Sequence, residues 1–321
     1  MSIQFIVTGA AGFIGSNLVS ALNARGHDRI LLVDALGSDE RWRNLVGLRY
    51  AGYMGREEFR EAVRKRTAPI PRTLFHLGAC SSTTEKNADF LIDNNTRTTR
   101  ELCEWSLANG VRFVYASSAA TYGDGAQGYS DADSVTPALK PLNMYGYSKQ
   151  MFDEWALKGG LLSKIAGLKY FNVYGPREAH KGDMRSVVNK AWHQIRETGE
   201  VQLFKSHHPK YKDGEQLRDF VYVRDAVAAT LFFHDHPEKS GLFNCGTGKA
   251  RTWNDLVRAV FSAMKKPVKI RYIDVPELLR EKYQYYTQAD ITKLRDAGFR
   301  NPFTELEAGV LDYVAGYLEQ R

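Results

Sequence analysis

The 321-residue sequence has few cysteines and no long apolar run, and each shortage excludes a class of protein. Its three cysteines, Cys80, Cys103 and Cys245, are spaced too widely for a disulfide framework or a zinc site, and we expect no metal. No stretch approaches the roughly 18 consecutive apolar residues of a membrane-spanning helix. From Met1 the chain passes directly into Phe5–Val7, without a basic segment, a long apolar core or a cleavage motif. We therefore expect no membrane association, no signal peptide and a cytoplasmic location.

Acidic residues are fewer than basic ones, and the formal net charge is +7 with a pI near 9.1. A nucleic-acid-binding protein usually gathers its Lys and Arg on one face, whereas here they are interleaved with Asp and Glu along the whole chain. We therefore expect no nucleic-acid partner and favour an anionic small molecule as substrate. The length allows one large α/β domain, or a nucleotide-binding domain with a smaller companion.

The first part of the chain follows the order strand, glycine turn, helix, strand, acid. An apolar strand is expected at Gln4–Thr8, and the turn GAAGFIG at 9–15 leads into an amphipathic helix that ends at Gly26. A second apolar strand covers Ile30–Val33 and is followed by Asp34. Glycines at such a turn let the backbone approach a pyrophosphate at the positive end of the helix. The order predicts a dinucleotide-binding unit, and a tight turn without a ligand is the weaker interpretation.

Strands and helices continue to alternate after this unit. Apolar strands are expected at Thr73–Leu77, Arg112–Ser117 and Ala166–Tyr170, and a long helix at Asp89–Asn109. Such alternation predicts an α/β fold with a Rossmann-type, doubly wound parallel sheet, whose ligands bind at the carboxyl ends of the strands. Several candidate functional residues lie at or just past predicted strand ends, namely Ala79, Cys80, Ser81, Ser117, Ser118 and Asn172.

The regular alternation stops near residue 172, which suggests a second unit. We expect residues 1–172 to form the Rossmann domain, with a return of the chain at 219–245. Residues 173–218 and 246–321 are then expected to form an interleaved, smaller mixed α/β domain that binds the substrate. Thr252 is expected to cap a helix that runs to about Lys265, and the capping-box sequence Thr304–Glu307 predicts the start of the last helix.

The stretch YGYSK at 145–149 carries the strongest candidate for proton transfer. Tyr145 and Lys149 are four residues apart, so on a helix they lie on one face. A free phenol has a pKa of about 10, too high for a base at neutral pH. A nearby ammonium, together with an oxidised nicotinamide, would lower that pKa. The pair alone is also compatible with two ordinary helix residues.

Six motifs occur in a defined order along nearly the whole chain. They are GAAGFIG at 9–15, LGACSST at 77–83, YASSAATYG at 115–123, YGYSK at 145–149, KYFNVYG at 169–175 and RDFVYVRD at 218–225. Together they resemble the extended short-chain dehydrogenase/reductase family, also called the NAD-dependent epimerase/dehydratase family, whose members act on nucleotide-activated sugars. The resemblance implies a nicotinamide cofactor and hydride transfer.

Three segments resemble a subgroup of that family more closely: FHLGACSSTTE at 75–85, YFNVYGPREAHKGDM at 170–184 and YQYYTQADITKLRDAGF at 283–299. This subgroup epimerises C-6″ of an ADP-activated heptose, in the synthesis of lipopolysaccharide-core precursors. The resemblance implies that C-6″ loses hydride and its hydroxyl proton to give a 6″-ketone, and that hydride then returns to the opposite face. Because the oxygen occupies two places, two acid/base groups are expected. A homo-oligomer is also implied, with a pentamer as the candidate assembly.

The resemblance assigns roles to individual residues. Tyr145 and Lys181 become the two acid/base groups, Lys149 the activator, and Ser118 (with Ser117 as the weaker candidate) the hydrogen-bond partner of the reacting oxygen. The implied cofactor-binding residues are Gly9, Ala10, Ala11, Gly12, Phe13, Ile14, Gly15, Asp34, Ala35, Arg41, Arg56, Leu77, Gly78, Ala79, Cys80, Ser81, Asn94, Lys149, Val173 and Lys181. The implied substrate-binding residues are Ser118, Asn172, Asp183, Lys190, Phe204, Lys205, Ser206, His207, Arg218 and Tyr283.

The cofactor's type depends on two opposing features. Asp34 alone favours NAD, since an acid at this position binds ribose hydroxyls. Arg41, Arg43 and Arg56 follow it, and a guanidinium suits a 2′-phosphate. The related enzymes favour NADP, with basic residues at the positions of Arg41 and Arg56. We expect NADP, with NAD as the alternative.

Some residues depart from the subgroup's pattern or have an alternative interpretation. Asp183 stands where a small or basic residue is usual, Lys190 where a histidine is expected, and His207–Glu215 lengthens the loop before Arg218. Arg218 could instead form a salt bridge with the adjacent aspartate. A loop lysine such as Lys181 is usually a solvated charge, but the surrounding AHKG sequence favours a functional one. His76 is expected to be a structural hydrogen-bonding residue.

Two other functions compete with this one. The first is another nucleotide-sugar enzyme of the family: a 4-epimerase would not need Lys181, and a 4,6-dehydratase generally has an Asp-Glu pair where this chain has Ala119-Ala120. The second is a non-catalytic cofactor sensor or RNA-binding relative. Such proteins typically lose the tyrosine or the lysine, and here Tyr145 and Lys149 are both present.

Overall fold

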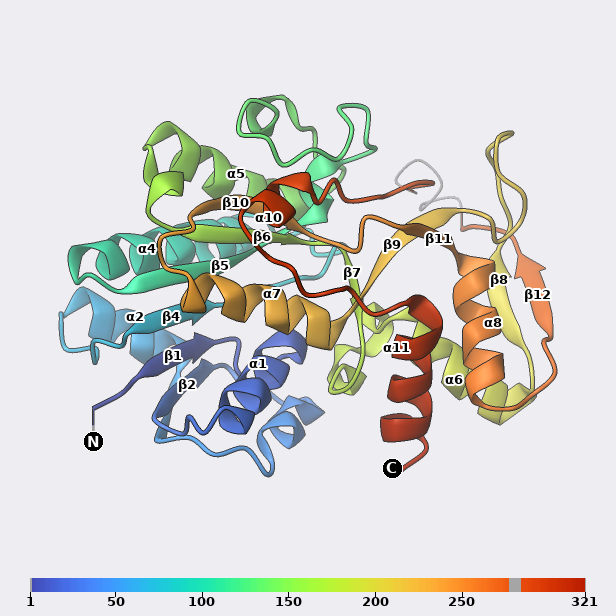
Figure 1. The fold of residues 1–321 in the computed structure, drawn as a ribbon, viewed down its shortest axis with the longest axis horizontal. Helices are drawn as coiled ribbons and strands as arrows, with labels where there is room; N and C mark the ends of the chain where they lie inside the picture. Colours follow the sequence, from blue (N-terminus) through green and yellow to red (C-terminus); the bar gives the residue numbers. More distant parts are fainter. Residues whose placement is uncertain (1, 277–283, 321) are drawn as a thin grey trace.

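A computed structural model describes residues 2–276 and 284–320, and its main element is a seven-stranded parallel sheet (Figure 1). The strand order is β10-β6-β5-β4-β1-β2-β3, and every neighbouring pair in it is parallel. This arrangement confirms the predicted doubly wound Rossmann-type sheet. The strands are β1 (Phe5–Thr8), β2 (Ile30–Asp34), β3 (Gly52–Gly55), β4 (Thr73–His76), β5 (Arg112–Ser118), β6 (Ala166–Tyr170) and β10 (Gly241–Cys245).

Helices cover both faces of this sheet, because side chains of successive strand residues point to opposite faces. Phe5 and Val7 of β1 pack into one apolar core, whereas Ile6 packs into a second one on the other face. The first core includes α1 (Phe13–Ala24) and α7 (Val223–Asp235), which lie side by side in Figure 1. The second core is formed with α2 (Arg56–Arg64), α4 (Thr98–Ala108) and α5 (Met144–Lys158).

A smaller region lies beyond the carboxyl ends of the large sheet, on the right in Figure 1. A three-stranded sheet has the order β11-β9-β7, and a parallel pair joins β12 to β8. Helices α6, α8 and α11 pack against one another beside these strands. The elements are β7 (Asn172–Tyr174), α6 (Val187–Thr198), β8 (Val201–Phe204), β9 (Leu217–Tyr222), β11 (Ala250–Thr252), α8 (Trp253–Ala263), β12 (Ile270–Ile273) and α11 (Leu306–Tyr313).

Short helices complete the structure. The other described elements are the 3₁₀ helices η1 (Glu40–Leu45), η3 (Ala119–Tyr122), η4 (Thr136–Ala138), η5 (Leu161–Ser163) and η6 (Ala179–Met184), the π-helical turns η2 (Ile92–Arg97) and η7 (Val314–Leu318), and the short α-helices α3 (Ala88–Leu91) and α10 (Thr292–Asp296). We keep two interleaved domains, 1–172 with 219–245 and 173–218 with 246–321, as a proposal. In the structure, β9 belongs to the three-stranded sheet, whereas the following α7 and β10 join the large sheet.

The caps of two helices test the local predictions. The Thr252 side chain accepts a hydrogen bond from Asp255 N at 2.9 Å, and Asp255 accepts one from Thr252 N at 3.2 Å, so α8 begins with a capping box. The predicted capping box at Thr304 is wrong, because the N-cap of α11 is Glu305. Thr304 instead donates its N–H and hydroxyl to Asp225 of α7, at 2.7 and 3.0 Å. A contact with a distant helix therefore replaces the local cap.

Candidate active site

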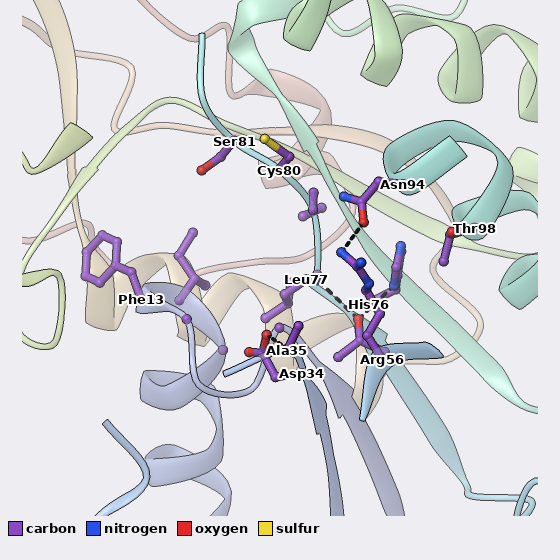
Figure 2. Close-up of a pocket in the computed structure, with 18 of the residues that line it drawn as sticks. Phe13, Asp34, Ala35, Arg56, His76, Leu77, Cys80, Ser81, Asn94 and Thr98 are labelled. Carbon is purple, nitrogen blue, oxygen red and sulfur yellow. Dashed lines mark hydrogen bonds between the residues drawn. The ribbon is translucent and has the colours of Figure 1, made fainter. Parts of the chain in front are cut away.

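A cavity of about 740 Å³ lies at the carboxyl ends of the large sheet's strands. Its volume falls within the usual range for cofactor sites, and its position is where such sheets bind ligands. It brings together the glycine turn, Tyr145, Lys149 and Lys181, which are far apart in the sequence. Most predicted cofactor residues line it, and Figure 2 shows several of their side chains, including Phe13, Asp34, Ala35, Arg56, Leu77, Cys80, Ser81 and Asn94. Ala10 and Ala11 are fully buried behind the turn.

The glycine turn fits only glycine at two positions. Gly9 has φ +67°, and a Cβ there would lie 2.7 Å from Gly78 N. A Cβ on Gly15 would lie 2.0 Å from Gly9 O. The turn can therefore pack tightly between α1 and the residues that follow β4. Gly12 is the N-cap of α1, so the first N–H groups of this helix face the cavity as a site for an anion such as a pyrophosphate.

Asp34 and two arginines form the end of the cavity at β2. Asp34 accepts hydrogen bonds from Ala11 N at 2.8 Å and Ala35 N at 2.7 Å; burial raises its pKa, and these bonds oppose the rise. Arg41 is held by Asp39, with Nη2–Oδ2 at 2.7 Å, and its Nη1 is 3.9 Å from Asp34. Arg56 donates to Asn94 Oδ1 at 2.6 Å. Both guanidinium groups line the cavity beside Asp34.

Tyr145 and Lys149 lie on the first two turns of α5, whose N-cap Asn143 accepts a hydrogen bond from Gly146 N at 2.8 Å. Lys149 is 5% exposed and donates to Ala116 O at 2.8 Å; burial lowers its pKa to about 8. Burial also raises the pKa of Tyr145, while a hydrogen bond with Ser118 opposes this rise. Desolvation is therefore the largest influence on the pKa of Tyr145, and the expected lowering by Lys149 together with an oxidised nicotinamide stays a prediction.

A buried network that sequence reasoning missed lies behind this pair. Asp153 and Lys169 are both 0% exposed, and Asp153 Oδ2 is 3.1 Å from Lys169 Nζ. Asp153 also accepts from Tyr115 OH at 2.9 Å and Ser117 Oγ at 2.6 Å. Its negative charge raises the pKa of Lys149 against the effect of burial. The spacing of Tyr145, Lys149 and Asp153, each four residues from the next, was the available signal.

This network also separates the two candidate serines. The Ser117 hydroxyl donates to Asp153, whereas Ser118 hydrogen-bonds with Tyr145. Both residues line the cavity. We therefore favour Ser118 as the residue that contacts a reacting oxygen.

Lys181 lies in η6, above the start of α1. Its Nζ is 5.5 Å from the centre of the Phe13 ring, and it lines the same cavity as Tyr145. Burial lowers its pKa, and the negative charge of Glu178 opposes this effect. Glu178 is 1% exposed and accepts from Ser186 N and Ser186 Oγ, both at 2.6 Å. Lys181 is therefore not an ordinary solvated charge.

His76 takes a structural position, in line with the sequence-based expectation. Its ring nitrogens are 2.7 Å from Thr8 Oγ1 and 2.9 Å from Thr99 Oγ1. Burial, with a smaller effect from Lys149, lowers its pKa to about 3. The imidazole is therefore neutral at pH 7 and joins β1, β4 and α4 by hydrogen bonds.

Most predicted substrate residues lie away from this cavity's lining. Ser118 lines it, whereas Asn172 and Asp183 are exposed and Lys190 is half-buried on α6. Arg218 is 6% exposed; it donates to Leu217 O at 2.8 Å and to Gln284 O, and its guanidinium is 5.6 Å from the Trp253 ring. Tyr283 lies outside the described residues.

Asp219, the alternative partner of Arg218, is held by other groups. Its carboxylate accepts from Thr247 N and Thr247 Oγ1, both at 2.7 Å, from Gly248 N at 2.9 Å and from Ala289 N at 3.0 Å. The salt-bridge interpretation of Arg218 is therefore the weaker one.

The predicted substrate segment Phe204–His207 follows β8 and is built into the smaller region. Lys205 Nζ is 3.4 Å from Asp274, Ser206 N donates to Asp213 Oδ1 at 2.7 Å, and His207 N donates to Tyr285 OH at 3.2 Å. Within the added stretch 207–215, His208 and Tyr211 pack on the Tyr285 ring, with centroid distances of 5.0 and 5.5 Å. The added residues 207–215 are thus ordered by contacts with Tyr285, next to the segment Phe204–His207.

A family model for the NAD dependent epimerase/dehydratase family matches residues 5–246. The chain belongs to this family. A curated relative from Nitratidesulfovibrio vulgaris strain DP4, named ADP-L-glycero-D-manno-heptose-6-epimerase, is 56% identical over 98% of both chains. One of the same name from Fusobacterium nucleatum is 46% identical, again over 98% of both chains. Family membership and the site's geometry make a nicotinamide dinucleotide the cofactor of this chain.

Solved structures show the same fold. The Helicobacter pylori ADP-L-glycero-D-manno-heptose-6-epimerase has a TM-score of 0.81 at 29% identity, over 98% of this chain and 96% of that one. The Thermus thermophilus UDP-glucose 4-epimerase in complex with NAD has a TM-score of 0.77 at 26% identity, over 97% and 98%. Within the described parts of the chain, no helix has the length and apolar character to cross a bilayer, and no group of His, Cys, Asp and Glu could hold a metal ion.

Proposed function

We propose that this protein is an ADP-L-glycero-D-manno-heptose 6-epimerase, which inverts C-6″ of ADP-D-glycero-D-manno-heptose. The observation that carries the proposal is that a second, half-buried ionisable group, Lys181, lines the same cavity as Tyr145 and the glycine turn. Near-full-length relatives with this name support it at 46–56% identity. The predicted cytoplasmic location and pentameric assembly stay predictions.

The residues of the cavity fit a nicotinamide dinucleotide phosphate. The N-terminus of α1 would bind the pyrophosphate, and Asp34 a ribose hydroxyl. Arg41 and Arg56 could bind a 2′-phosphate, which supports NADP over NAD. Lys149 would hold the ribose of the nicotinamide. When bound, the cofactor supplies a reversible hydride acceptor for a secondary alcohol.

Tyr145 and Ser118 would act on the oxygen of C-6″ in one of its two positions. A phenolate at Tyr145 can take the hydroxyl proton as hydride leaves the carbon, and can return a proton in the reverse direction. The Ser118 hydroxyl, which hydrogen-bonds with Tyr145, would stabilise the charge that develops on this oxygen. Because burial raises the pKa of Tyr145, the phenolate needs positive charge nearby, which Lys149 provides.

Lys181 would serve the oxygen in its second position. After the ketone has turned, hydride returns to its opposite face and the new hydroxyl group needs a proton. Burial lowers the pKa of Lys181, which makes its ammonium a better proton donor than a solvated lysine. Two groups in one cavity can therefore serve both arrangements of the carbonyl group, with no net redox change.

A second candidate is a UDP-hexose 4-epimerase, because such enzymes share the fold. The Thermotoga maritima UDP-glucose 4-epimerase has a TM-score of 0.80 at 27% identity. Dehydration is disfavoured, since Ala119 and Ala120 form a short 3₁₀ helix capped by Ser118 and provide no acid. A non-catalytic sensor is disfavoured because Tyr145, Lys149 and Ser118 line one cavity.

The deciding experiment is incubation with ADP-D-glycero-D-manno-heptose, with the configuration at C-6″ followed by NMR. Inversion at C-6″, abolished in Tyr145→Phe, is the expected result. An unchanged heptose combined with epimerisation of a UDP-hexose at C-4″ would replace the proposal with the second candidate. Mass spectrometry of nucleotide released from the purified enzyme would distinguish NADP from NAD.

A further inference from the structure

The segment that carries Lys181 crosses over the dinucleotide-binding turn. Residues 175–186, which we call the Lys181 loop, connect β7 to α6 and include η6. Two asparagines of the Rossmann domain hold its first half. Asn17 Nδ2 donates to Pro176 O at 2.9 Å, and Asn44 Nδ2 lies 3.0 Å from Arg177 O and 3.1 Å from His180 Nδ1. His180 directly precedes Lys181.

Asn44 also holds the glycine turn. Its Nδ2 lies 2.9 Å from Ala11 O, while Ala11 N donates to Asp34 at 2.8 Å. One side chain thus contacts the turn at the pyrophosphate site and two residues of the Lys181 loop. A further hydrogen bond joins the same two residues in the opposite direction, because the Arg177 guanidinium donates to the main-chain oxygen of Asn44.

The surroundings make these hydrogen bonds costly to lose. Asn44 is 5% exposed, and its two N–H groups are shared among three acceptors. Burial lowers the pKa of His180 to about 4, so its ring is neutral at pH 7 and Nδ1 can accept. An apolar replacement would leave the oxygens of Ala11 and Arg177 without this donor, in a place that admits little water.

We propose that Asn44 is a positioning residue that couples the cofactor-binding turn to the loop carrying the second acid/base group. The part concerning Lys181 rests on the proposed function, whereas the part concerning the turn does not. Because one amide holds both segments, loss of its donors shifts the turn under the cofactor and releases the loop that places Lys181. The coupling keeps the cofactor bound while the loop stays ordered over it.

The first test measures cofactor retention. Asn44→Leu keeps the branching and the number of heavy atoms of the side chain and removes both donors. Loss of bound nicotinamide nucleotide, followed after dilution of the purified enzyme, should become about tenfold faster or more. Asn23→Ala is the matched control: Asn23 also makes three hydrogen bonds, to His27 O, Arg49 O and Arg49 N, all away from the cavity.

The control should lower the unfolding temperature without changing the rate of nucleotide loss. Equal rates of nucleotide loss in Asn44→Leu and the unaltered enzyme would overturn the proposal. If Asn44→Leu does not fold, Asn44→Ala also removes both donors and gives the same test with the same two outcomes.

The second test asks whether Asn44 acts through Lys181. With nucleotide saturating, kcat is measured for Asn44→Leu, for Lys181→Met and for the double variant. If Asn44 positions Lys181, Asn44→Leu lowers kcat about tenfold when Lys181 is present. The same substitution then has little further effect on kcat in the Lys181→Met variant. KM for the nucleotide sugar should change less than kcat. Additive losses would overturn this half of the proposal.

The two tests also separate this inference from the proposed function. If the enzyme does not epimerise ADP-heptose at all, the proposed function fails, and the rate of nucleotide loss still decides the role of Asn44 at the turn. If epimerisation proceeds but both Asn44 measurements match the unaltered enzyme, the inference alone fails.

Discussion

Tyr145 and Lys181 are proposed for the same kind of proton transfer, yet the protein holds them in different ways. Tyr145 belongs to the 15-residue helix α5, which packs on the large sheet and begins with a side-chain cap. Lys181 belongs to the six-residue 3₁₀ helix η6, none of whose residues is fully buried. The comparison shows that one site can combine a group fixed by a regular element with one fixed by long-range contacts.

The difference has a physical cause. In α5, the backbone hydrogen bonds of the helix set the spacing of Tyr145, Lys149 and Asp153 without help from other segments. The Lys181 loop has few such bonds and depends on Asn17, Asn44 and Glu178. The helix should therefore tolerate changes around it better than the loop does.

The largest expected effect comes from Tyr145→Phe. It removes the hydroxyl and leaves α5 intact, so epimerisation should fall by about 10³-fold, in the range of general acid–base catalysis. The unfolding temperature should stay close to that of the unaltered enzyme. Loss of structure in this variant, seen by circular dichroism, would contradict the prediction, because it would show that Tyr145 is needed for folding.

Lys181→Met should reduce epimerisation by about 10²-fold. The expected loss of activity is smaller than for Tyr145→Phe, because Lys181 is only half-buried and water can partly take its place as proton donor. Methionine keeps most of the length of the side chain and can still contact Phe13, so the variant separates the effect of the charge from that of packing. Turnover followed by NMR at C-6″ gives the result, and undiminished activity would remove the need for a second acid/base group.

Glu178→Gln should change the pH dependence more than the maximal rate. The Glu178 charge raises the pKa of Lys181 against burial, so its removal lowers that pKa further. The decline of kcat that depends on protonated Lys181 should therefore move to lower pH, with activity at its optimum within about tenfold of the unaltered enzyme. Because the glutamine oxygen can still accept one of the two hydrogen bonds from Ser186, an unchanged pH profile would show that the charge has no role.

His76 lines the same cavity but is not one of the two proposed acid/base groups. Its replacement therefore serves as the reference for the variants of Tyr145 and Lys181. His76→Gln should leave kcat within about threefold of the unaltered enzyme, because the imidazole is already neutral.

The same residue should make stability depend on pH. The pKa of His76 in the folded protein is about 3, against an ordinary value of 6.5, so the unfolded chain binds more protons between these values. Stability is therefore lost as pH falls from 6.5 toward 3, by at most about 1.4 kcal/mol per pH unit from this group.

Urea unfolding at several pH values measures this contribution. The slope of unfolding free energy against pH should be shallower in His76→Gln than in the unaltered enzyme. The same slope in both proteins would show that His76 is not neutralised by burial.

The elements around the cofactor site could be predicted because their signals are local. The glycine turn, Asp34 and the apolar strands around them follow from spacing and periodicity within about 30 residues. The cap of α8 at Thr252 is equally local. The prediction failed at Thr304, where the residue binds Asp225 of a distant helix.

Residues that act across the fold could not be found in this way. Asn44 contacts Arg177 and His180, more than 130 positions along the chain, and nothing in the sequence around it signals this role. The Asp153–Lys169 ion pair likewise joins a helix to a neighbouring strand. Lys181 was predicted from resemblance alone, because a lysine in a polar loop has no pattern that separates it from a solvated one.

The order of the large sheet has a consequence for how the chain is made. Among the described residues, strand β10 pairs only with β6, so residues up to Cys245 must leave the ribosome before the sheet is complete. Until then the fully buried strand β6 has an open edge, a state that favours association with other chains. The family match begins at Phe5, the first residue of β1, and ends at residue 246, just after β10. The part of the chain that the family model matches thus coincides with the length that contains all seven strands of the sheet.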